Sequence, residues 1–232
     1  MREWVTVVTA PEVEPVALPE ARLALGLDAG SDAPVIMQHI EAARELAEAF
    51  TGRALITTTL CLHLSAFPAS SPLEWWDGVR DGVLPEYQSS ITLPRPPAQS
   101  VTSIKYTDTS GSEQTVDAST YYLAGDRIML TPGSMWPSGA RQGTIEVTYD
   151  AGYGDSPADV PSAIRNAILA HVRDVIERPN AAISSETIDN ASVTYGAQRL
   201  GSSSGSGPDS TGGLRGGAAA MLHAYRALRL GG

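Results

Sequence analysis

Residues 40–55 read IEAARELAEAFTGRAL, and this stretch marks a change from helix to strand. Apolar side chains recur at helical spacing before and within it, which predicts an amphipathic helix whose buried stripe is Ile36, Ile40, Ala43, Ala47 and Phe50. Gly52 suits the position after the last helical residue, where a left-handed backbone ends a helix. A β-like run, ALITTTLCLHL, follows at once. The chain is therefore expected to leave a helix at Thr51-Gly52-Arg53 and to enter a β module.

Two further helices are expected around this one. The stretch ALPEARLALGL has Pro19 near its start and Gly26 near its end, while Asp32 and Pro34 suit the start of the central helix. Downstream, a helix should begin near Pro161 and run to about Arg178, with a buried face made of Ile164, Ile168, Val172, Val175 and Ile176. Residues 1–17 are punctuated by proline and are expected to be extended.

The intervening residues, 54–153, have a β composition with turn signals between short runs. We expect strands near 55–64, 89–93, 100–107, 113–117, 120–124, 126–131 and 143–149, with hairpins around residues 108–111 and 124–126. No alternation of strand and helix occurs here, so the sheet should be antiparallel.

The composition excludes several classes of protein. The 232-residue chain has 42% apolar residues and a formal net charge of −10, without a run of basic residues, which disfavours a nucleic-acid-binding surface. Its single cysteine, Cys61, cannot form an internal disulfide or a cysteine-rich zinc site. We expect no signal peptide, because no basic region precedes a continuous apolar run, and no transmembrane helix, because no apolar run reaches about 18 residues.

The C-terminal part has a different character. Residues 201–213 are rich in serine and glycine and are expected to form a linker. The stretch AAAMLHAYRALRL then predicts a short helix with Met221, Leu222, Tyr225 and Leu228 roughly on one face. Such a helix is too short to be stable alone, so it needs a surface on its own body or on a partner.

Together these patterns predict an α+β fold: a small helical bundle, an inserted antiparallel β module and a tethered C-terminal helix. The expected divisions are an N-terminal arm and core helices at 1–53, the β insert at 54–156, a core helix at 157–180 and a tail at 181–232.

No catalytic or metal-binding constellation emerges, and we expect no cofactor. Gly201-Ser-Ser-Ser-Gly205 matches a hydrolase pattern but lies in the linker, without the strand that the pattern requires. Cys61 and His63 should share one face of a strand, yet no third group is evident and packing is the simpler interpretation. The four histidines, His39, His63, His171 and His223, are scattered. Asp150, Asp155 and Asp159 lack the spacing of a calcium loop, and Trp75-Trp76 marks either a binding surface or a buried cluster.

An ordered set of stretches carries a family resemblance. It comprises EPVALPEARLALGL, IEAARELAEAFTGRALITTT, LPRPPAQSVTSIKYTD, VTYDAGYGD, VPSAIRNAILAHV and a final MLHAYR. In this order they resemble the head–tail connector, or adaptor, proteins of long-tailed bacteriophages, prophages and phage-like gene transfer agents. The resemblance covers most of residues 12–178 and returns at the C-terminus; the serine- and glycine-rich stretch departs from it.

This resemblance implies a structural, non-enzymatic role in the virion neck. Connector subunits form a ring, usually of twelve copies, beneath the portal protein; the ring extends the DNA channel and receives a stopper or tail-terminator-type neck protein. DNA would pass through it without sequence-specific binding, and no membrane is involved. The C-terminal helix would dock on the portal, with Met221, Leu222, Tyr225, Arg226 and Leu228 as contact residues. Twelve copies would carry a formal charge of about −120, which should discourage DNA from adhering.

Three alternatives remain open at this point. The chain could be another tail or baseplate structural protein, a cytoplasmic α+β enzyme supported only by Cys61 and His63, or a monomeric ligand-binding domain.

Overall fold

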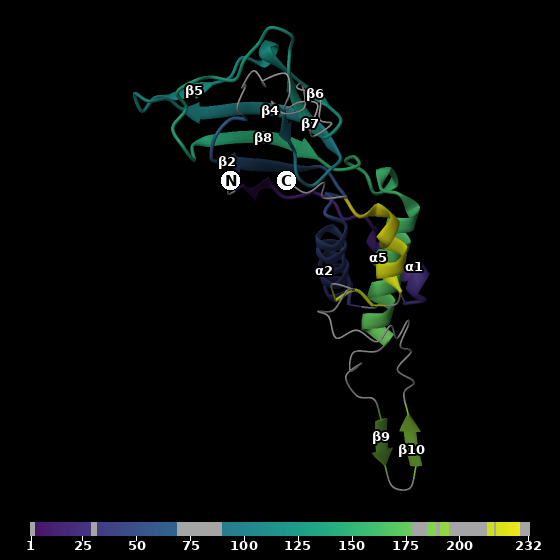
Figure 1. The fold of residues 1–232 in the computed structure, drawn as a ribbon. Coiled ribbons are helices and arrows are strands. Elements are labelled where there is room, and N and C mark those ends of the chain that lie inside the picture. The colour runs from purple at the N-terminus through teal and green to yellow at the C-terminus, as the bar shows by residue number, and fades with distance from the viewer. Residues whose placement is uncertain are drawn as a thin grey trace, which may run out of the picture. The chain divides into compact units, whose positions relative to one another are not determined.

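The computed structural model describes residues 3–28, 32–68, 90–177, 213–215 and 217–227, together with the backbone of 185–188 and 191–194. The chain divides into two compact units, each of which is described by itself (Figure 1). The β unit contains Met1–Val13 and Gly52–Asp159, and the helical unit contains Glu14–Thr51 and Val160–Gly232. The predicted α+β class with an antiparallel sheet is confirmed.

The described residues of the β unit form two antiparallel sheets. The larger sheet has the strand order β1-β2-β8-β4-β5 and the smaller has the order β3-β7-β6. The strands are β1 (Trp4–Thr9), β2 (Thr58–Leu64), β3 (Ile91–Thr92), β4 (Ala98–Thr107), β5 (Glu113–Thr115), β6 (Tyr121–Ala124), β7 (Arg127–Leu130) and β8 (Ile145–Ala151). Strands β2 to β8 fall within or next to the seven ranges expected from the sequence, and the hairpins β4–β5 and β6–β7 occur where the turn signals predicted them.

The core of this unit lies between the two sheets. One face of the larger sheet contributes Leu60, Leu62, Ile104, Val147 and Tyr149, and the smaller sheet contributes Ile91, Tyr121 and Ile128. Tyr149 is fully buried, and its hydroxyl donates a hydrogen bond to the Pro94 carbonyl at 2.6 Å. Alternate residues of the larger sheet, such as Thr59, His63 and Glu146, lie on the opposite, polar face, as strand geometry requires.

Three stretches that carried the family resemblance meet at one place in the β unit. The Ala54 amide donates to the Pro96 carbonyl, which joins TGRAL to LPRPP. The Gly152 amide, from AGYGD, donates to the Pro97 carbonyl at 2.9 Å. Gly152 has a φ of +141°, and a Cβ there would lie 2.5 Å from the carbonyl carbon of Ile56. The helix therefore ends at Gly52 because the next residues form the junction that begins the β unit.

The helical unit contains α1 (Leu18–Leu25), α2 (Ala33–Thr51), α5 (Ser162–Glu177) and α6 (Ala218–Leu222), with a 3-10 turn at His223–Tyr225. Gly26 and Gly52 have φ values of +66° and +70° and end α1 and α2 as predicted. Helix α2 packs on α5, α1 contacts both, and the Arg165 guanidinium bonds to the Glu20 carboxylate across α5 and α1. None of the helices in the described residues combines the length and apolarity needed to span a bilayer.

Some details differ from the sequence expectations. On α2 the buried stripe includes Arg44 and Thr51, whereas Phe50 is only partly buried. On α5, Val175 and Ile176 are partly exposed, while Ala167 and His171 are buried. Periodicity identified the correct side of each helix, but the exact residues depend on the neighbours, which include α6.

Two additional strand features were not identified from the sequence. The extended N-terminal region contains β1, which pairs with β2 and so belongs to the β unit. Within the tail, β9 (Ser185–Ile188) and β10 (Ala191–Thr194) form an antiparallel hairpin. Their short, mostly polar stretches carry little strand signal in isolation.

Candidate docking segment at the C-terminus

The C-terminal segment, residues 213–215 and 217–227, packs on the other helices of the helical unit. Leu214, Ala218 and Leu222 are 7%, 0% and 0% exposed, and the spacing of four residues places Ala218 and Leu222 on one face of α6. Helix α6 contacts both α5 and α2. The surface that this short helix requires is therefore provided by its own bundle in this structure.

Polar contacts hold both ends of the segment. At its start, the Arg215 amide donates to Nδ1 of His171 on α5 at 2.9 Å. At its end, the Ala227 amide donates to the Thr51 carbonyl at 2.7 Å, which satisfies a carbonyl at the end of α2. The Arg226 guanidinium carbon lies 5.3 Å from the centre of the Phe50 ring, within the range of a cation–π contact. The segment is thus positioned by backbone hydrogen bonds as well as by apolar packing.

His171 must be neutral for this arrangement, because Nδ1 can accept a hydrogen bond only when it carries no proton. Burial lowers the pKa of His171, and the charge of Arg215 and the proximity of His39 lower it further, while Asp174 opposes the change. The electrostatic environment therefore favours the protonation state that binds the Arg215 amide.

The five residues expected to contact a portal occupy different environments. Leu222 is completely buried in the bundle, Tyr225 is partly buried, and Met221 and Arg226 are exposed. Met221 and Leu222 do not share a face, because neighbouring helical residues point about 100° apart. Leu228 lies outside the described residues. Contact through Leu222 would require α6 to leave the bundle, whereas Met221 and Arg226 are accessible where they are.

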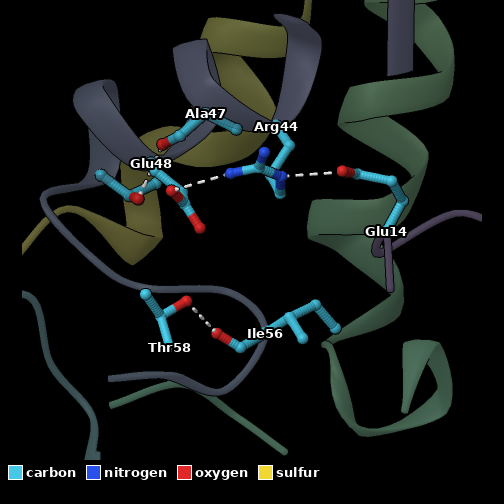
Figure 2. A network of polar contacts seen from close by, with 7 residues as sticks. Glu14, Arg44, Ala47, Glu48, Ile56 and Thr58 are labelled. Atoms are coloured by element: carbon cyan, nitrogen blue, oxygen red, sulfur yellow. Dashed lines mark hydrogen bonds and ion pairs between the residues drawn. The ribbon is translucent and has the colours of Figure 1, made fainter. Parts of the chain in front are cut away.

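A buried ion-pair network lies within the helical unit (Figure 2). Arg44 on α2 donates from Nε to the Glu14 carboxylate at 2.9 Å and from Nη1 to the Glu48 carboxylate at 3.4 Å. Burial raises the pKa of Glu14; Arg44 opposes this, and Glu41 and Glu48 add to it. Burial would lower the pKa of Arg44, but the carboxylates of Glu14, Glu48 and Glu45 raise it overall. Arg44 thus joins the segment before α1 to α2, a role that helical periodicity does not reveal.

Cys61 and His63 lie on the same polar face of β2 as predicted, but their contacts are those of packed residues. Cys61 is 6% exposed, and burial, with Glu146 as a second cause, raises the pKa of its thiol. His63 stacks on Trp4 with ring centres 4.8 Å apart, and Thr6 bonds to its Nε2 at 3.1 Å. A raised thiol pKa disfavours the thiolate that a nucleophilic cysteine requires.

The remaining sequence candidates show structural roles or fall outside the described residues. Asp150 accepts hydrogen bonds from Thr59 and Ser100, and Asp159 accepts one from the Ser156 amide in a turn. Within the described ranges, no group of three or more His, Cys, Asp or Glu side chains is arranged to hold a metal ion. Trp75, Trp76 and Gly201–Gly205 lie outside those ranges.

His171 and Thr51 were not predicted as contacts of the C-terminal segment. His171 and Arg215 are 44 residues apart in the chain, and no local pattern links them. The presence of a histidine in the middle of an otherwise apolar helix face was the one available signal.

The fold has counterparts among solved structures of particle components. A chain from "Neck of empty GTA particle computed with C6 symmetry" is 22% identical with a TM-score of 0.66, over 99% of this chain and 98% of that chain. A chain from "Virion of native gene transfer agent (GTA) particle" is 22% identical with a TM-score of 0.65, over 98% and 97%. A chain from "Neck of native GTA particle computed with C12 symmetry" is 24% identical with a TM-score of 0.62, over 99% and 98%.

At these identities the likeness demonstrates a shared fold along nearly the whole chain. No family model and no curated protein matches the sequence.

Proposed function

We propose that this chain is a structural subunit of a virion neck, a head–tail connector that forms a ring under the portal protein. The ring extends the DNA channel and links the head to a stopper or tail-terminator-type neck protein. The observation that carries the proposal is the shared fold, which spans at least 98% of this chain in three particle structures described as a neck or a virion. The C6 and C12 symmetries of the two neck structures support a homo-oligomeric ring, with twelve copies as the expected number.

The surroundings of Cys61 support a role without catalysis. Its thiol is buried with a raised pKa, and His63 is engaged by Trp4 and Thr6. We therefore expect Cys61→Ala to assemble as the unchanged protein does. Loss of assembly in a correctly folded Cys61→Ala protein would contradict this interpretation.

We propose the exposed side of the C-terminal segment as the portal contact. Met221 is 45% exposed and Arg226 is exposed, so they can be reached without moving α6. Tyr225 and Leu228 would extend this contact, and Leu222 would join it only if α6 separates from α5. A segment presented by every subunit of a ring multiplies weak contacts into avidity. The net charge of −10 per chain is consistent with a channel wall that does not retain DNA.

The decisive experiment is a pull-down against the portal protein from the same genome, with negative-stain imaging of the complexes. It compares the full-length chain, a chain ending at Gly213, and Met221→Glu. Met135→Glu is the matched control, since Met135 is 74% exposed in the β unit. We expect the full-length chain and the control to form a ring coaxial with the portal, and the truncated chain and Met221→Glu to bind weakly.

Absence of portal binding by the full-length chain would refute the connector role and favour another tail or baseplate position. Equal binding by all four proteins would preserve the connector role and refute the proposed docking segment.

A further inference from the structure

Strand β1 forms an edge of the larger sheet and is unusually exposed. It pairs with β2 on one side, and in the part of the chain that the structure describes no strand pairs with its other side. Trp4, Val7 and Val8 are 49%, 50% and 58% exposed. Its six residues, WVTVVT, contain neither a charge nor a proline. An edge of this composition can pair with another chain along Trp4–Val7, before the register shift between Val7 and Thr9.

Val7 shows that the sheet's core is incomplete at this edge. It lies opposite Leu60 in the register, on the face that carries the buried side chains of β2. Val5, on the same face, packs against the core, yet Val7 remains half exposed. Side chains on a core-facing position are normally covered, so among the described residues this end of the core lacks a covering surface.

The opposite edge of the same sheet is β5, and it has features that protect an edge strand against pairing with another chain. Strand β5 has only three residues, and its Glu113 forms an ion pair with Lys105 at 2.9 Å. A short, charged edge discourages addition of another strand. The two edges of one sheet therefore have different chemistry, and β1 has that of an interface.

We infer that β1 is a subunit–subunit contact, covered in the assembled ring by a second copy of this chain. This inference rests on the proposed ring and goes beyond it by assigning the contact surface. A ring requires each subunit to contact its neighbours, and β1 suits a second copy as the occupant: each chain carries −10, and the uncharged β1 adds no repulsion between copies. A contact between β1 and a different surface of the next copy is heterologous, which is the type of contact that closes a ring.

The test places a negative charge on β1. Val8→Glu adds a carboxylate at the most exposed apolar position of the strand, whereas Val8→Thr keeps a β-branched, uncharged side chain. Leu23→Glu, at an 86% exposed position of α1, is the matched control. Ring formation is measured by sedimentation and negative-stain imaging with the portal protein present, and folding by circular dichroism and tryptophan emission.

We expect Val8→Glu to fold normally but to need more than about a hundredfold higher concentration to form rings, because the interface would bury a carboxylate without a partner. Val8→Thr and Leu23→Glu should form rings as the unchanged chain does. Rings of Val8→Glu at the normal concentration would overturn the inference while leaving the connector role intact. A full-length chain that forms no ring with the portal would instead refute the proposed function.

A second measurement identifies the occupant. Val8→Cys in a Cys61→Ala background provides one thiol for a cross-linker, and mass spectrometry identifies the attached peptide. A peptide of this chain that links isotope-labelled and unlabelled copies in mixed rings supports the inference. A peptide from the portal or from a tail-side protein overturns it.

Discussion

Replacing Arg44 with methionine should destabilise the helical unit by about 3 kcal/mol near neutral pH, because the change leaves buried carboxylates without their cation. The side chains of Arg44, Glu14 and Glu48 are 9%, 16% and 12% exposed. Removal of one partner from a buried ion pair costs roughly 3–5 kcal/mol, and the residual exposure of the two carboxylates favours the lower end. The population of unfolded helical unit should rise about a hundredfold.

The destabilisation caused by Arg44→Met should be larger at high pH than at low pH. The pKa of Glu14 is already raised in the folded protein, so its protonated form is the one that the fold favours. Loss of the Arg44 charge raises the pKa of Glu14 further. A carboxyl group whose pKa is raised by folding stabilises the folded state at pH values below its ordinary pKa of 4.5. This stabilisation is lost as the pH rises through the pKa of the folded state. The deficit of Arg44→Met should therefore be greatest at about pH 8 and should shrink as the pH falls and Glu14 becomes protonated.

The distribution of tryptophan allows the two units to be followed separately. All four tryptophans belong to the β unit, at positions 4, 75, 76 and 136. Urea unfolding followed by far-UV circular dichroism reports mainly on the helices, and tryptophan emission reports on the β unit. The variant should shift the circular dichroism transition. An Arg44→Met protein whose helical transition matches that of the unchanged chain at about pH 8 would refute the assigned role of the network.

Three further predictions concern other packed positions. Leu222→Ala should lower the free energy of unfolding of the helical unit by about 3 kcal/mol and expose the C-terminal segment to limited proteolysis. Met221→Ala should leave the cleavage rate unchanged. The pKa of His171 is lowered, so the stability it provides is present above its ordinary value of 6.5 and lost as pH falls. The protection of the Arg215 amide against hydrogen exchange, relative to an unfolded peptide at the same pH, should therefore decrease on acidification, and His171→Gln should abolish that dependence. Gly152→Ala should destabilise the β unit by about 2 kcal/mol or more, measured by tryptophan emission in urea, because its Cβ would overlap backbone atoms.

Much of the architecture was predictable because its signals are local. The stripe beginning at Ile36 and the glycine at position 52 located α2 and its end. The turn signals around residues 108–111 and 124–126 located two hairpins. Each of these features depends on residues within a few positions of one another, so sequence spacing is sufficient.

The candidate docking segment was predictable only in outline. The pattern of residues 218–230 indicated a short helix that needs a surface, but its two possible surfaces, the chain's own body and a partner, could not be distinguished. The structure places Leu222 inside the bundle and leaves Met221 exposed. Ala218 is also fully buried, and its methyl group allows α6 to lie close to the larger helices.

The sequence by itself determined the kinds of elements, their order, the antiparallel sheet and the break after Thr51. Tertiary structure alone decided that Arg44 meets Glu14, that His171 receives the Arg215 amide, and that β1 lies at an edge with Val7 uncovered. Helical and strand periods show which side of an element is apolar, since they arise from local backbone geometry. The partner of each side chain is selected by the free energy of packing the whole chain, in which residues 30 or 44 positions apart become neighbours.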